Sequence, residues 1–255
     1  MAFTDRFKKS SNPVLSEERL QSASRSDGGS TSIDYDGGTS TVSGAVNKSF
    51  ILGFLLLLTS FYAFANPSTL FVWGGAIGGL GLVIAMCYKP KWSSTLAPIY
   101  ALVEGLFVGS ISATYAASFG IGLVFQAILL TISLLFMMLF IYKTGIIKVT
   151  EKFRTGVVMA TGAIFVVYMA NIVLGMFGIN IPFLHEGGMI GIGISVVIII
   201  VATLNLLLDF DSFERIEAVS APKYMEWFVS MGLIVTLVWL YLELLRLLSV
   251  LSGDD

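Results

Sequence analysis

Four carboxylic acids stand within or at the ends of long apolar stretches of this chain. Asp209 and Asp211 lie at the end of one stretch, Glu104 lies inside an earlier one, and Glu243 lies inside the last, three residues before Arg246. A charged group at the centre of a membrane helix costs roughly 2.5 to 3.5 kcal/mol on insertion scales, so such groups need partners or water. These acids are therefore candidates for proton or cation chemistry.

Asp209 and Asp211 would face different directions on one helix, because two residues span about 200° at about 100° per residue. We expect only one of them to face into a helix bundle. Asn205 lies one turn before Asp209 and extends a polar face, which favours Asp209. Asp211 could instead form a surface pair with Arg215 at i+4. The pattern alone leaves both acids as candidates.

Glu104 and Glu243 each allow a structural interpretation beside a functional one. Glu104 could be a neutral acid hydrogen-bonded to a neighbouring helix, or it could line an ion path. Glu243 and Arg246 lie on one helix face at i,i+3, which indicates a local ion pair. The functional alternative is a latch that releases the last helix when this pair breaks.

Carboxylates suit a hard cation such as Ca²⁺, which takes six to eight oxygen ligands. A few acids spread over three helices cannot form a high-affinity cage, but they fit transient binding along a path, with Asp211 and Asp209 as the contacts. Removal of a carboxyl group from water disfavours its charged form, so such a path would respond to pH. We therefore expect Ca²⁺ as a transported ion and predict no cofactor.

The composition indicates a membrane protein. The 255 residues are 56% hydrophobic and 13% charged, whereas a soluble domain carries about 25% charged residues. A net charge of −2 argues against a nucleic-acid partner. The single cysteine, Cys87, excludes an intrachain disulfide, and the single histidine, His185, lacks the second histidine of an HExxH zinc site. The chain is therefore not predicted to be an enzyme.

Seven apolar stretches approach or exceed the length of about 20 residues that crosses a bilayer. They cover 49–65, 68–88, 95–117, 120–142, 155–177, 188–210 and 225–250. Residues 1–47 are polar and rich in Ser, Gly, Thr and Asp, so we expect a disordered cytoplasmic tail before a seven-helix transmembrane domain over 48–252.

Small residues at a spacing of four predict close helix packing. Gly75 and Gly79 form one such set, and Gly105, Gly109 and Ala113 form another. A flexible gate at Gly105 is the alternative.

The basic residues predict the orientation of these helices. Except for Arg246, every Lys and Arg lies in the N-terminal region or in a connection on the same side of the predicted bundle. The positive-inside rule then places the N-terminus in the cytoplasm and the C-terminus outside.

Four stretches, at 100–112, 205–217, 221–227 and 232–248, together resemble the Bax inhibitor-1/YccA-like family of transmembrane BAX inhibitor motif proteins. The resemblance extends over roughly 48–250 and is greatest to a bacterial branch with a long polar N-terminus. It implies six helices around a central seventh, C-terminal helix, and it implies the bacterial inner (plasma) membrane as the location.

The resemblance also implies a site. Members of the family are described as pH-sensitive calcium leak channels, in which an acid of helix six hydrogen-bonds an acid of helix seven. The first acid belongs to a Phe-Asp-(Ser/Thr) motif, here Phe210-Asp211-Ser212, so the resemblance favours Asp211 over Asp209. Thr236 stands where the second acid is expected, ten residues before Arg246. Either Thr236 donates a hydrogen bond to Asp211, or Glu243 serves a different acid site.

The hypothesis that follows is a cation leak, for Ca²⁺, in which a proton added to Asp211 or Asp209 loosens its contact with the last helix. Glu104, Glu243 and Arg246 would form the ion path or a latch. The alternative is a non-conducting regulator that binds membrane proteases, cell-death factors or other membrane proteins. A proton-coupled transporter is less favoured, because the sequence has no inverted repeat and no pair of Gly/Pro-broken helices.

Overall fold

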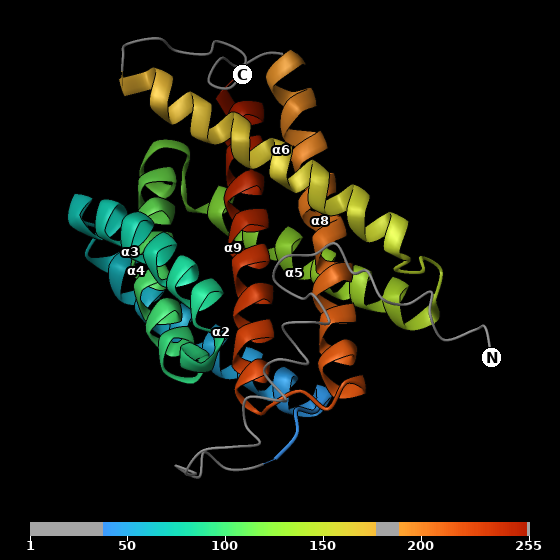
Figure 1. The fold of residues 1–255 in the computed structure, drawn as a ribbon. Coiled ribbons are helices and arrows are strands. Elements are labelled where there is room, and N and C mark those ends of the chain that lie inside the picture. Colours follow the sequence, from blue (N-terminus) through green and yellow to red (C-terminus); the bar gives the residue numbers. More distant parts are fainter. Residues whose placement is uncertain (1–37, 177–188, 254–255) are drawn as a thin grey trace, which may run out of the picture.

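The computed structural model describes residues 38–176 and 189–253, so His185 lies outside the described residues. Within these ranges the secondary structure is helical, apart from an isolated bridge between Thr39 and Pro222. Figure 1 shows α2 (Val42–Ala65), α3 (Thr69–Tyr88), α4 (Ser93–Phe119), α5 (Ile121–Thr144), α6 (Glu151–Met176), α8 (Met189–Ala218) and α9 (Tyr224–Gly253), and a short 3₁₀ helix, η2 (Pro90–Trp92), precedes α4.

All seven long helices are long and apolar enough to cross a membrane, so the prediction of a seven-helix integral membrane protein is confirmed. Helix α2 begins at Val42, inside the predicted tail, because the Thr41 hydroxyl caps it by accepting a hydrogen bond from the Gly44 N–H at 3.0 Å. Helix α8 continues to Ala218, beyond its predicted end at residue 210, so Asp209 and Asp211 both lie on a helix.

Helix α9 is the centre of the bundle. Of its most apolar stretch, 72% is buried, against 44% for α4 and α8 and 6% for α6. It packs against α2, α4, α5 and α8, and it runs through the middle of the molecule in Figure 1. The expectation of a central C-terminal helix is therefore confirmed.

Glycines allow α4 to lie very close to its neighbours. A Cβ atom at Gly105 would collide with the Leu56 carbonyl of α2, and one at Gly109 would collide with the Ser60 carbonyl. A Cβ atom at Gly75 of α3 would collide with the Cβ atom of Phe107 in α4. These contacts confirm the prediction that the small residues serve packing.

The basic segments meet at one end of the bundle. Lys48 near the start of α2 pairs with Glu226 at the start of α9, and Arg154 near the start of α6 pairs with Asp211 near the end of α8. The first residue of α4 hydrogen-bonds the first residue of α9. We call this the basic end, and we call the opposite end, where α9 finishes, the far end. The predicted topology places these basic segments on one side of the bundle, and in the structure they lie together at one end.

Candidate functional site

Asp209 of α8 meets the central helix. Its carboxyl group lies beside the Thr236 hydroxyl of α9, which donates to the Gly232 carbonyl at 3.2 Å. Gly232, one turn earlier on α9, leaves space for the acid, since a Cβ atom there would lie 3.7 Å from Asp209 Oδ1. The Oδ2 oxygen of Asp209 is buried and has no hydrogen-bond partner among the described residues. An acid oxygen of this kind can still accept a proton, a water molecule or a cation.

A cavity of about 200 Å³ lies beside Asp209 and is lined by α6, α8 and α9. Arg154 and Val158 of α6, Ser212 of α8 and Met231 of α9 contribute to its wall. The Arg154 Nε atom is buried and, within the described part of the chain, also lacks a hydrogen-bond partner. The cavity has polar groups and room for water.

Asp211 joins α8 to α6. Its Oδ2 oxygen accepts hydrogen bonds from Arg154 and, at 2.7 Å, from Nε of Arg215. Arg215 also donates to Glu151 at 2.6 Å. The predicted i,i+4 pair with Arg215 is confirmed, whereas Thr236 lies beside the neighbouring acid, Asp209.

Asp209 and Asp211 contact different helices, in keeping with their different directions on α8. Asp209 contacts α9, while Asp211 contacts α6. The reason is that α8 packs against both of these helices, so acids about 200° apart each find one.

Three side chains of α6 recur every seven residues and each contacts a polar group of α8 or α9. Arg154 pairs with Asp211, the Thr161 hydroxyl accepts a hydrogen bond from Asn205 at 2.7 Å, and Tyr168 donates to Glu243. Seven residues make about two turns, so the three share one face over about 21 Å of helix. We call Arg154, Thr161 and Tyr168 the polar stripe of α6.

Glu243 and Arg246 lie at the far end of this stripe. Their Oε2 and Nη1 atoms are 3.9 Å apart, which confirms the predicted i,i+3 pair, and Arg246 also donates to the Tyr168 hydroxyl at 3.3 Å. These three residues line a second cavity of about 510 Å³, together with Tyr115 and Asn171. The far cavity is therefore lined by a carboxyl group, a guanidinium group and uncharged polar groups.

Glu104 lies on a different pair of helices. Its carboxyl group is buried between α4 and α3 and occupies the space that Gly79 leaves by having no side chain. Because this contact is made with α3, Glu104 does not belong to the group of acids on α8 and α9.

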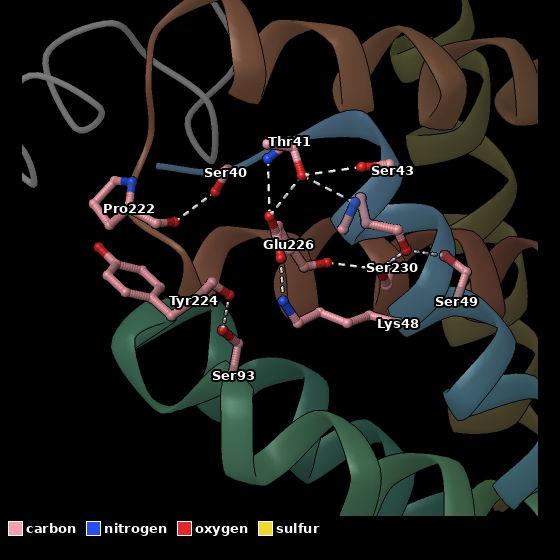
Figure 2. A network of polar contacts seen from close by, with 12 residues as sticks. Ser40, Thr41, Ser43, Lys48, Ser49, Ser93, Pro222, Tyr224, Glu226 and Ser230 are labelled. Atoms are coloured by element: carbon pink, nitrogen blue, oxygen red, sulfur yellow. Dashed lines mark hydrogen bonds and ion pairs between the residues drawn. The ribbon is translucent and has the colours of Figure 1, made fainter. Parts of the chain in front are cut away.

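Glu226 is a buried acid that the sequence analysis did not single out. Its side chain has no exposed surface and pairs with Lys48, as Figure 2 shows. It also accepts hydrogen bonds from the Thr41 N–H at 2.8 Å and from the Thr41 hydroxyl at 3.3 Å. One turn later, Ser230 donates to the Ala45 carbonyl at 2.7 Å. These contacts, which we call the Glu226 clasp, fasten the start of α9 to the start of α2.

Two sequence signals could have revealed the residues that were missed. The seven-residue spacing of Arg154, Thr161 and Tyr168 is visible in the sequence, since each interrupts an apolar helix on the same face. Glu226 and Lys48 each stand at the basic end of an apolar stretch and have opposite charges. Neither pattern identifies the partner on another helix, which depends on packing.

A scan against protein families matches residues 12–253 to the family described as Bax inhibitor 1 like. The chain belongs to this family. The match includes every described helix, so the resemblance inferred from the sequence is confirmed. Bax inhibitor 1 like proteins are generally non-enzymatic membrane proteins. A comparison with curated proteins gives no match.

Proposed function

We propose that this Bax inhibitor 1 like protein is a pH-sensitive cation leak channel for Ca²⁺, with Asp209 as its main proton-sensitive group. The observation that carries the proposal is the buried Oδ2 oxygen of Asp209, which borders a cavity and has no hydrogen-bond partner among the described residues. An ionised carboxyl in this position carries a negative charge beside the cavity, and one proton removes that charge.

The proposed path follows the polar stripe of α6. It begins at the cavity beside Asp209, passes the hydrogen bond between Thr161 and Asn205, and reaches the far cavity beside Glu243. These groups are spread over three helices, and no cluster of three or more metal-ligating side chains occurs in the described residues. Acids spread in this way can bind a hard cation briefly, one after another, but they cannot form a single high-affinity site. In the predicted orientation the path runs from the cytoplasm to the outside.

The proposed gate is the contact between Asp209 and Thr236. When Asp209 is ionised, Thr236 donates a charge-assisted hydrogen bond, which is about twice as strong as a bond between neutral groups. When Asp209 is protonated, the bond is neutral and holds α8 less firmly against α9. The leak is therefore expected to rise as the pH falls. Asp211 is the second candidate, because its protonation would weaken the link between α8 and α6.

Thr236 would make the rise of the cation leak with falling pH gradual. In the two-acid pair that the family resemblance implies, a hydrogen bond exists only while one carboxyl carries a proton, since two ionised carboxylates repel. A threonine hydroxyl can donate to a carboxylate and accept from a carboxylic acid. The contact with Asp209 therefore persists in both states, and only its strength changes.

Calcium flux into dye-loaded proteoliposomes tests the proposal. Between about pH 8 and about pH 5, the range in which perturbed carboxyls titrate, the flux through the wild-type protein should increase severalfold. Asp209→Asn should give a high flux that no longer depends on pH. Glu217→Gln, which changes an exposed acid on the same helix, is the matched control and should behave as wild type. An absence of wild-type flux throughout this range would refute the leak, and an unchanged pH response in Asp209→Asn would refute the role of Asp209.

The second candidate function is a non-conducting regulator that binds membrane proteases or cell-death factors. It is supported by the position of the N-terminal segment, which pairs with the turn between α8 and α9 through Thr39 and Pro222 and through a bond of 2.8 Å from the Ser40 N–H to the Ala221 carbonyl. The described part of the chain therefore begins at the basic end. Deletion of residues 1–37, which leaves the Glu226 clasp intact, separates the two functions: loss of a cellular effect with unchanged flux would indicate partner binding.

A further inference from the structure

An apolar groove of about 360 Å³ opens between α2 and α5. Both helices pack against α9, but they do not pack closely against each other. Gly53 and Phe61 of α2 form one wall, Ile128 of α5 forms the other, and Leu237 and Val238 of α9 form part of the floor. The central helix, which is otherwise covered by protein, therefore reaches the outside of the bundle along this groove.

The side chains that line the groove have no charge and no unpaired hydroxyl group with which to bind a polar ligand. None of its lining residues is charged, and each of its four hydroxyl groups already has a protein partner. Ser60 donates to the Gly105 carbonyl at 3.0 Å, Thr131 donates to the Ala127 carbonyl at 2.8 Å, and the hydroxyls of Ser112 and Tyr241 lie 2.6 Å apart. Water or a charged molecule in the groove would lose hydrogen bonds without replacement.

We propose that this groove binds one acyl chain of a membrane lipid. Its mouth lies between two membrane-spanning helices, and Phe61 at the rim is 81% exposed, so hydrocarbon surrounds the opening. An empty groove would deprive its lining of van der Waals contacts, and an acyl chain restores them without any polar group. The proposal is independent of ion conduction, because the groove is separate from the polar stripe of α6.

Gly53 allows the groove to be filled from within. The nearest atom to a Cβ at this position is Cδ1 of Ile234, at 4.0 Å, so a Cβ atom meets no clash, and Gly53→Leu adds a side chain at a position that lines the groove. Gly81→Leu is the matched control, because Gly81 is an exposed residue of α3 with nothing within 4 Å of its Cβ position. Ile128→Trp fills the groove from the α5 side and tests the same point if Gly53→Leu fails to fold.

Native mass spectrometry measures the bound lipid after reconstitution in an equal mixture of phosphatidylethanolamine and phosphatidylglycerol and extraction into mild detergent. Wild type and Gly81→Leu should retain one lipid, in equal amounts of the two classes because the groove is uncharged. Gly53→Leu and Ile128→Trp should lose most of this lipid. Unchanged retention in folded filling variants, retention of one headgroup class alone, or binding of detergent alone would overturn the proposal.

Discussion

At the scale of single residues, Thr236 determines how the Asp209 carboxyl is held. Its hydroxyl has one proton and two neighbours that can accept it, because it lies 3.2 Å from the Gly232 carbonyl oxygen and also lies beside the Asp209 carboxyl group. A protonated Asp209 can donate to Thr236 while Thr236 donates to Gly232, whereas an ionised Asp209 takes the threonine proton itself. The proton on Asp209 therefore sets the direction of both bonds.

Replacement of Thr236 by an acid should change the shape of the pH profile. In Thr236→Asp, two carboxyls would share one proton near neutral pH, and both would ionise and repel at higher pH. We therefore expect the calcium leak of Thr236→Asp to rise severalfold at alkaline pH, in addition to its rise at acidic pH. Thr236→Val, which has a similar shape but no hydroxyl, should leak more at neutral pH and respond less to acid. A Thr236→Asp profile identical to that of wild type would contradict this account of the gate.

The sequence was informative about which residues carry charge and less informative about their partners. The spacing between Asn205 and Asp209 indicated a polar face of α8, and the i,i+4 and i,i+3 pairs of Asp211 and Glu243 followed from helix periodicity. The contact between Asp209 and Thr236 depends on the rotation of α8 against α9. That rotation is set by the packing of many side chains, so no local pattern contains it.

At the scale of elements, the Glu226 clasp fixes where α9 begins. Three different groups converge on one carboxylate: a lysine, a backbone N–H at the start of α2 and a threonine hydroxyl. Gly44 is required beside it, because a Cβ atom at that position would collide with the carboxylate. The clasp is thus a rigid attachment of the central helix at the basic end.

Removal of the Glu226 carboxyl should destabilise the bundle. Glu226→Ala leaves Lys48, whose side chain is 14% exposed, without its ion-pair partner, and loss of one member of a buried pair costs about 3 to 5 kcal/mol. Denaturant unfolding in detergent micelles measures this change. Glu217→Ala, at an exposed position of α8, should change stability by no more than about 0.5 kcal/mol. Equal stability of the two variants would show that the clasp contributes little.

The helices themselves could be predicted because each is a long apolar stretch, and length and hydropathy suffice for that. The boundaries at the basic end could not be predicted in this way. Residues 42–48 include Ser43, Gly44, Asn47 and Lys48 and precede the continuous apolar stretch, and their helix depends on the cap at Thr41 and the contacts with Glu226. The last two turns of α8 are charged, and the pairs of Asp211 with Arg154 and Arg215 support them.

At the scale of the whole molecule, the polar stripe of α6 connects two cavities near opposite ends of the bundle. If the proposed path is correct, Glu243 is a position along it and Asp209 is the gate. Glu243→Gln should therefore lower calcium flux severalfold at every pH but leave the pH dependence unchanged, because the proton-sensitive contact is intact. Proteoliposome flux measured over the same pH range as for Asp209→Asn checks this. A change in the pH profile without a change in maximal flux would assign the gate to Glu243 instead.

The central position of α9 has a consequence for biosynthesis. The ribosome makes this helix after α2, α3, α4, α5, α6 and α8, so these helices are synthesised before the central element of the bundle exists. Until then Lys48 has no Glu226 to pair with, whereas the glycine-mediated contact of α2 with α4 can already form. Assembly of the bundle therefore waits for the synthesis of α9, and a nascent protein that stops short of α9 lacks its central helix and is a substrate for the cell's quality control.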